Sequence, residues 1–235
     1  MINLIINEFK KVGLFKIILS FIIFLIVIIT IYEFNDNMKD TVLNLIPFVG
    51  IVSSILFSGI ISNEIEQGTF RFYLTKPISR KKIYKSKLLA IIIYNIILLT
   101  FIFYIYTVLC KSIDKQDFVK FVKYSSSLLV INSIIILLST IIRNTSLTVG
   151  IAISLLTFGL LITQLLLDIE ISFIEYTFLQ YLDFSIFNDK ETIMVMNELY
   201  NINLSIKSGI VINFIYTYIF YKVGNYIFIK KDIKN

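Results

Sequence analysis

The chain has 235 residues, of which 57% are hydrophobic and only 16% are charged. This composition excludes an ordinary soluble domain and is typical of a membrane protein. The formal net charge is +6, and the chain has no histidine, which removes the commonest general base and metal ligand. The single cysteine, Cys110, cannot form a disulfide within the chain, and we expect it to pack inertly at the end of an apolar run.

Six apolar runs divide the sequence, each near the roughly 20 residues that a helix needs to cross a bilayer. They cover residues 14–32, 42–61, 88–110, 124–142, 147–167 and 209–229. Continuous runs of this length exclude the weak alternation of a transmembrane β-barrel. The sequence therefore predicts one all-α integral membrane domain over residues 1–235, with six transmembrane helices.

Two further segments are too polar or too interrupted to span. Residues 1–11 place Ile2, Ile5, Ile6 and Phe9 on one helical face and the polar residues, Glu8 included, elsewhere. This pattern predicts an interfacial elbow helix lying on the membrane, with a frayed terminus as the alternative. Residues 168–208 contain apolar patches too short to cross, which predict one or two short re-entrant or interfacial helices on the external side.

The distribution of charge predicts the orientation. Six crossings put both termini on one side, and the segments of that side hold 14 basic and 4 acidic residues. The opposite side holds 7 basic and 12 acidic residues, and Lys222 lies inside the sixth run. The positive-inside rule therefore predicts cytoplasmic termini. The excess of Ile, Asn, Lys, Tyr and Phe is typical of an AT-rich bacterial genome, so we expect the plasma membrane of a bacterium. Contact with anionic membrane lipid is enough to explain the basicity, and nucleic-acid binding is not needed.

The sequence lacks the motifs of the common hydrolases. It contains no Gly-x-x-x-x-Gly-Lys-Ser/Thr phosphate loop, no His-Glu-x-x-His zinc site and no Gly-x-Ser-x-Gly elbow. We therefore expect no catalytic residues, no metal site and no cofactor in this chain.

The polar residues within the runs are mostly neutral, as in Asn95, Asn132 and Asn213. Such groups favour hydrogen bonds between helices over an ion path. Lys222 is expected to extend toward the headgroups.

The long basic interruption at residues 63–87 is the most informative stretch. Asn63 followed by Glu66 predicts a capping-box-like helix start, and Gly68 permits a sharp change of direction. Pro77 is expected to end this helix, and Ser79 to cap the next one.

This stretch resembles the signature of the type-2 ABC exporter permeases. The matching residues are Glu64-Ile-Glu-Gln-Gly-Thr and then Leu74-x-x-Pro-Ile-Ser-Arg, followed by Ile83 and Lys87. The resemblance implies a cytoplasmic coupling helix between spans two and three. In this family the coupling helix docks on a separate ATPase. The resemblance implies that the residues in or beside this helix are Glu64, Glu66, Gly68, Thr69 and Arg71. It also implies that the return into span three is shaped by Pro77, Ser79, Arg80 and Lys87. The aromatic residues Phe70, Phe72 and Tyr73 depart from the family pattern.

The function that the resemblance implies is that of the membrane subunit of an ATP-driven exporter. The implied partners are an ABC ATP-binding subunit, which would carry ATP and Mg²⁺, and a second permease, either identical or homologous. Because the spans hold almost no charge, we expect an amphipathic or apolar cargo such as a peptide, an antimicrobial compound or a lipid-like molecule. The alternative is a resistance or sensory partner of an ABC ATPase that exports nothing.

Overall fold

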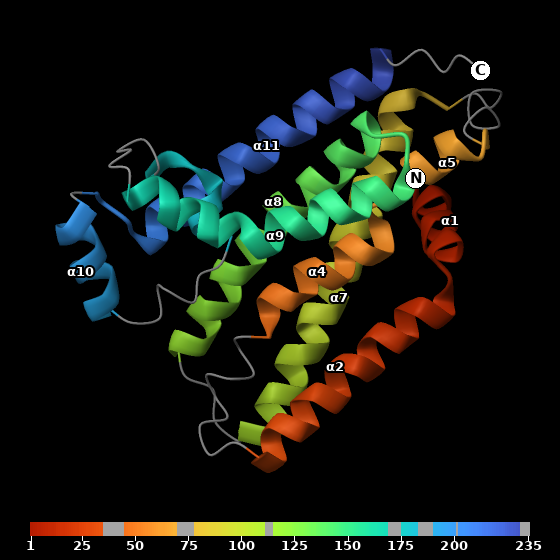
Figure 1. Ribbon diagram of the computed structural model, residues 1–235. Coiled ribbons are helices and arrows are strands. Elements are labelled where there is room, and N and C mark those ends of the chain that lie inside the picture. Colours follow the sequence, from red (N-terminus) through yellow and green to blue (C-terminus); the bar gives the residue numbers. More distant parts are fainter. Residues whose placement is uncertain are drawn as a thin grey trace.

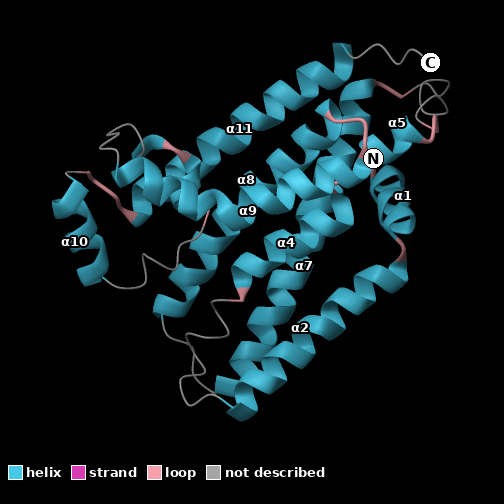
Figure 2. Ribbon diagram, in the orientation of Figure 1, coloured by secondary structure: helices cyan, strands magenta, loops and turns pink. Residues whose placement is uncertain are grey.

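The computed structural model describes residues 1–34, 45–69, 78–110, 115–168, 175–182, 190–200 and 202–230. Every regular element in these ranges is helical (Figures 1 and 2). The elements are α1 Ile2–Val12, α2 Leu14–Phe34, α4 Ile46–Phe57, α5 Ser62–Glu66, α7 Arg80–Cys110, α8 Lys115–Ile141, α9 Thr145–Asp168, η2 Phe178–Tyr181, α10 Lys190–Tyr200 and α11 Ile206–Lys230.

Four helical stretches in the described ranges are long and apolar enough to cross a membrane. They are Leu14–Glu33, Phe48–Glu66, Arg80–Leu109 and Phe121–Ile141. These stretches correspond to the first four expected spans. The last two expected spans also fall on helices, α9 with 24 residues and α11 with 25. In α9, however, the described apolar stretch covers only Thr145–Gly159, and tyrosine and asparagine side chains lower the hydropathy of α11. The six-span topology therefore stays a prediction.

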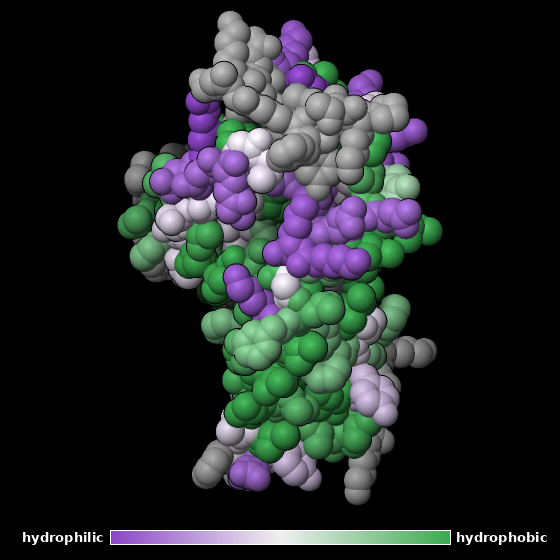
Figure 3. All heavy atoms as spheres, turned by 90° about the vertical axis from the view of Figure 1, so that its right-hand side faces the viewer, coloured by the Kyte–Doolittle hydropathy of each residue, from purple (hydrophilic) through white to green (hydrophobic). Residues whose placement is uncertain are grey.

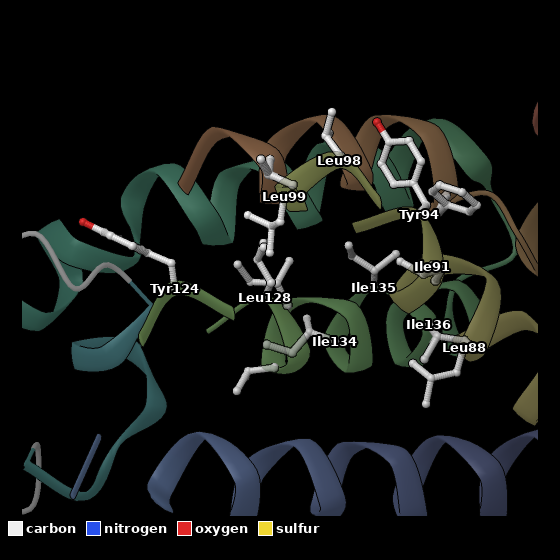
Figure 4. Packing of buried hydrophobic residues seen from close by; sticks show 14 of the residues in the cluster. Leu88, Ile91, Tyr94, Leu98, Leu99, Tyr124, Leu128, Ile134, Ile135 and Ile136 are labelled. Atoms are coloured by element: carbon white, nitrogen blue, oxygen red, sulfur yellow. The ribbon is translucent and has the colours of Figure 1, made fainter. Parts of the chain in front are cut away.

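Helix α8 lies at the centre of the bundle. It packs against α4, α7, α9 and α11, and its contact with α11 is the most extensive between described elements. Within its apolar window, 67% of the residues are buried, compared with 17% in α2. Figure 4 shows the apolar side chains of α7, such as Leu88 and Ile91, beside those of α8, such as Leu128 and Ile135. Helix α2 lies at the periphery and leaves most of its apolar surface uncovered in this chain (Figure 1).

Several helices begin or end away from the expected boundaries. Helix α7 begins at Arg80, eight residues before the expected start of the third span at Leu88, so the basic residues from Arg80 to Lys87 are helical. Helix α8 begins at Lys115, nine residues before the expected start of the fourth span at residue 124, in the segment between the third and fourth expected spans. The expected helices between the last two long helices appear as η2 and α10. Their re-entrant or interfacial position stays a prediction.

Neutral polar side chains join the long helices. Asn95 of α7 donates a hydrogen bond of 2.5 Å to Asn132 of α8. The side-chain amide of Asn213 on α11 donates to the hydroxyl of Ser126 on α8 at 3.3 Å. These bonds confirm the helix-joining role expected for such residues. The ammonium of Lys222 lies 5.2 Å from the centre of the Tyr218 ring, which is a cation–π contact on an exposed part of α11.

Candidate coupling site

The helix formed by α4 and α5 is broken at residues 58–61, close to the end of the bundle that holds α1 (Figure 1). Up to the break, Ser58 N–H donates to the Ser54 carbonyl in the ordinary helical pattern. Ile60 N–H then donates to the Phe57 carbonyl three residues back, which is a tighter turn. A change of this kind within an apolar helix leaves backbone groups without helical partners.

Two side chains from neighbouring helices supply those partners. The hydroxyl oxygen of Ser139 on α8 accepts from Ile61 N–H at 2.8 Å and from Ser62 N–H at 3.0 Å. The ammonium of Lys87 on α7 donates to the carbonyl of Ile60 at 2.9 Å. The expected cap of α5 by Asn63 is therefore wrong. The helix begins at Ser62 with Ile61 at the cap position, so Asn63 lies inside the helix, and Ser139 satisfies the first N–H groups from outside.

Lys87 is also part of a closed ring of four charged side chains. Its ammonium lies 3.0 Å from Glu8 Oε2 and 2.8 Å from Glu64 Oε1. The ammonium of Lys11 lies 3.1 Å from Glu8 Oε1 and also contacts Glu64 Oε1. We refer to Glu8, Lys11, Glu64 and Lys87 as the charge ring. It joins α1, α5 and α7, and its formal charges cancel.

Three members of the charge ring are removed from solvent. The side chain of Lys87 is 0% exposed, that of Glu8 is 2% exposed and that of Glu64 is 7% exposed, whereas that of Lys11 is 40% exposed. Desolvating such charges is costly, and removal of one partner from a buried ion pair typically costs about 3–5 kcal/mol because the remaining charge is left uncompensated. The ring therefore holds α1, α5 and α7 in a defined arrangement.

The orientation of α1 follows from this ring. The sequence pattern placed Glu8 away from the apolar face, but Glu8 is buried while Ile2 and Ile6 are 73% and 45% exposed. Phe9, next to Glu8, packs edge-on against Phe57 of α4, with ring centroids 6.4 Å apart. Helix α1 is present as expected, yet its inward face combines an aromatic ring with a carboxylate. The periodicity of α1 alone gave no sign of Glu8 as a buried site residue, because its buried cationic partner Lys87 lies 79 residues away.

A second carboxylate of α5 contacts α9. Glu66 Oε2 accepts from Thr145 N–H at 3.3 Å and from the Thr145 hydroxyl at 3.1 Å. Thr145 begins α9, so Glu66 lies where the unpaired N–H groups and the helix dipole favour a negative charge. The same helix start is capped from within the chain, since Asn144 Oδ1 accepts from Leu147 N–H at 3.0 Å. Glu66 itself is exposed.

The chain turns away after α5 at Gly68. Its φ is +68°, in the left-handed region that glycine adopts without a steric penalty, so the expected change of direction is confirmed. The hydroxyl of Thr69 donates to the carbonyl of Glu64 at 3.4 Å across this turn. Arg71 and Pro77 lie outside the described residues, as do the aromatic residues at positions 70, 72 and 73.

The remaining predicted residues lie at the start of α7. The carbonyl of Ser79 accepts from Lys82 N–H at 2.9 Å and from Ile83 N–H at 3.2 Å, so Ser79 is at the cap position. Arg80 Nη1 donates to the carbonyl of Ile229 at 2.7 Å, close to the end of α11. The structure thus brings the start of α7 against the end of α11. Lys87 lies about two turns further along α7, inside the charge ring and away from this turn.

A cavity of about 290 Å³ borders the charge ring between α1, α4, α5 and α9. Its polar lining consists of Glu8, Lys11, Lys16, Asn63, Glu64 and Thr145. Figure 3 shows hydrophilic side chains gathered at the end of the molecule where α1 and α5 lie, next to a hydrophobic body. The site is therefore at a boundary between charged and apolar surface.

Comparison with known proteins agrees with this architecture. The model of the family described as "ABC-2 family transporter protein" matches residues 29–233. An uncharacterized protein of Bacillus subtilis (strain 168), YhcI, is 24% identical over 226 residues, which cover 86% of this chain and 68% of YhcI. The family match includes the broken helix, the start of α7 and both long helices that follow α8. This chain belongs to the ABC-2 family of transporter membrane proteins.

Proposed function

We propose that this chain is the six-span permease subunit of an ATP-driven exporter and that α5, with the turn at Gly68, carries force from a separate ATP-binding subunit. The observation that supports this most directly is the charge ring, which fixes α5 to α1 and α7 through buried ion pairs. A force applied to the short helix α5 is thereby shared with two other helices. Both termini and the ATP-binding partner lie on the cytoplasmic side in this proposal.

The two carboxylates of α5 have different roles in this proposal. Glu64 faces the interior of the chain and anchors α5, whereas Glu66 and the following residues Gln67 and Gly68 are exposed. The exposed residues are the part of the described segment that a partner subunit can contact. Glu66 also contacts the start of α9, so a partner that draws Glu66 away would release α9 at the same time.

The break between α4 and α5 is the proposed hinge. Its backbone groups are satisfied by the side chains of Ser139 and Lys87, not by the helix itself. Side-chain partners of this kind can be exchanged in a movement without melting either helix. ATP-linked closure of the partner dimer would tilt α5 about residues 58–61 and open a path for an amphipathic or apolar cargo between two permease copies.

The test is transport by the reconstituted complex of permease and ABC ATPase, with a fluorescent cationic amphipathic peptide as the probe cargo. Glu66→Lys and Gly68→Pro should lower ATP-dependent peptide accumulation about tenfold or more, while the permease still inserts. Gly68→Pro should also lower the thermal stability, because proline cannot adopt the φ of +68° at this position. Lys82→Gln, an exposed change on α7 outside the charge ring, is the matched control. Normal ATPase binding together with normal peptide accumulation in both α5 variants would contradict the coupling role.

A second candidate function is a resistance or sensory partner of an ABC ATPase that exports nothing. Docking through α5 serves both functions equally well, so the discriminating measurement is cargo movement. ATP turnover that responds to the α5 variants, without accumulation of amphipathic peptides, drugs or labelled lipids in proteoliposomes, would favour this second function.

A further inference from the structure

The cavity beside the charge ring has a lining of mixed character. Charged side chains of α1, α2 and α5 contribute to it, and so do the apolar side chains of Val12, Ile55, Leu56 and Val149. Ile55 is 54% exposed, and Asn63 in the same lining is also exposed, so the cavity reaches the molecular surface. A volume of about 290 Å³ lies at the small end of ligand pockets, which suits the headgroup of an amphiphile but not an entire lipid.

The charges around the cavity leave an excess of one positive charge. The four members of the charge ring balance one another, and Lys16 at the start of α2 adds one cation. Lys16 is exposed and has no ion-pair partner among the described residues. The nearest further carboxylate on α5, that of Glu66, is held by Thr145 at the start of α9.

Hydrogen-bond donors accompany this cation. Lys16 offers an ammonium, the partly exposed Lys11 offers a second one, and Asn63 offers an exposed side-chain amide. Ammonium and amide donors around a single net positive charge are suited to a phosphodiester, which carries one negative charge. A phosphate monoester carries nearly two negative charges, and the carboxylates of Glu8 and Glu64 in the same wall disfavour this larger charge.

We propose that this cavity binds the phosphodiester headgroup of a singly charged anionic phospholipid of the cytoplasmic leaflet, with its glycerol and the start of its acyl chains against Ile55, Leu56 and Val149. The phosphodiester lies at Lys16, with Lys11 and Asn63 as further donors. Basic pockets at the cytoplasmic ends of membrane helices take up lipid headgroups for the same electrostatic reason. The inference rests on the proposed function, in which α1 lies on the cytoplasmic side of the membrane.

The proposed site also connects lipid to the coupling site. Glu8, Lys11 and Glu64 belong both to the charge ring and to the cavity wall. A bound phosphodiester draws Lys11 partly away from the two carboxylates, whereas the fully buried Lys87 keeps its ion pairs. The lipid thus acts on the exposed side of the ring without dismantling it.

The experiment measures lipid binding to the purified full chain in neutral detergent, by native mass spectrometry and by the shift in melting temperature. The probes are dioleoylphosphatidylglycerol, dioleoylphosphatidylcholine and soluble glycerophosphoglycerol. Lys16→Gln removes the free cation, and Lys10→Gln is the matched control, because Lys10 is an exposed lysine of α1 outside the cavity lining. Ile55→Gln tests the apolar wall, with the equally exposed Ile96 of α7 changed to Gln as its control.

We expect phosphatidylglycerol to bind the unmodified chain, and its affinity to fall about tenfold or more in Lys16→Gln and severalfold in Ile55→Gln. Both controls should bind as the unmodified chain does, and phosphatidylcholine should bind more weakly than phosphatidylglycerol. Equal binding by Lys16→Gln and Lys10→Gln, or by the two lipids, would overturn the proposal. Binding of glycerophosphoglycerol as tight as that of the lipid would also overturn it, because the acyl chains would then contribute nothing.

The lipid-binding experiment and the peptide-transport experiment can fail independently of each other. If peptide transport depends on Glu66 and Gly68 but lipid binding is indifferent to Lys16, the coupling role stands and the lipid site fails. If lipid binding depends on Lys16 in a chain that does not transport, the lipid site stands alone.

Discussion

The ammonium of Lys87 lies 2.8 Å from Glu64 Oε1, and this contact links the third long stretch of helix to the short helix α5, 23 residues earlier in the chain. The same ammonium donates to the carbonyl of Ile60 at the break before α5. Lys87 is therefore both an ionic anchor and a partner for a backbone group that the helix leaves unpaired. At the end of the basic stretch, Lys87 is expected from the sequence only to shape the return into the third span.

Replacement of Lys87 by methionine should destabilise the chain by about 3–5 kcal/mol, because Glu8 and Glu64 would stay buried without this cation. Chemical unfolding in mixed micelles measures this loss. Lys82→Met changes an exposed lysine on the same helix and should alter the free energy of unfolding by less than about 0.5 kcal/mol.

The double variant Glu64→Gln with Lys87→Met tests the cause of that loss. It removes one charge of each sign and leaves the pair formed by Glu8 and Lys11, which are 3.1 Å apart. We expect it to recover a large part of the stability lost in Lys87→Met. A double variant as unstable as the sum of the two single variants would mean that packing around Lys87, not charge, accounts for its effect.

Ser139→Ala should cost about 1–3 kcal/mol, because the N–H groups of Ile61 and Ser62 both lose their acceptor in a buried place. Ser133→Ala on the same helix is the control, since the Ser133 hydroxyl donates only to Val130 within α8. Unfolding curves of the two variants should separate clearly. Similar stability in both would show that the break between α4 and α5 does not need Ser139.

Gly224→Ala should destabilise the contact between α7 and α11, because a methyl group there would collide with the hydroxyl of Tyr84. Tyr84 is fully buried, and such overpacking typically costs about 1–3 kcal/mol. Tyr84→Phe in the same chain removes the clashing oxygen and should restore part of the melting temperature. Gly150→Ala is the matched control within α9, since nothing lies within 4 Å of the added methyl group.

Glu175 should hold the segment before α11 most firmly above pH 5. A hydrogen bond with the Tyr176 side chain, followed by one from Asn203 N–H at 2.8 Å, lowers the pKa of Glu175 below its usual value of about 4.3. Because the folded-state pKa is depressed, the stabilisation is present above the unfolded-state pKa and is lost as the pH falls through the folded-state pKa.

Amide hydrogen exchange at Asn203 can test this dependence. The protection of Asn203 should be greater in the unmodified chain than in Glu175→Gln above the unfolded-state pKa, and the difference should disappear as the pH falls through the lowered folded-state pKa of Glu175. A difference that persists unchanged at the lower pH would show that the ionised carboxylate is not the group responsible.

The sequence by itself determined the elements that depend on local composition. Apolar runs of the length of a bilayer predicted the long helices, because backbone groups in hydrocarbon must be paired within the segment. The glycine at position 68 predicted the turn after α5, since its left-handed backbone needs no partner from elsewhere. The motif at residues 64–87 also indicated the family, which the match over residues 29–233 confirms.

Only the tertiary structure decided what the charged residues of the site do. Glu8 belongs to a helix whose periodicity assigns it to the polar face, and it is buried because Lys87 reaches it from 79 residues away. Glu64 and Glu66 look alike in the sequence, yet one is enclosed by the charge ring and the other is exposed beside Thr145. Their difference arises because α1, α7 and α9 converge on α5, and the sign and burial of a partner brought from a distant segment leave no periodic signal in the sequence.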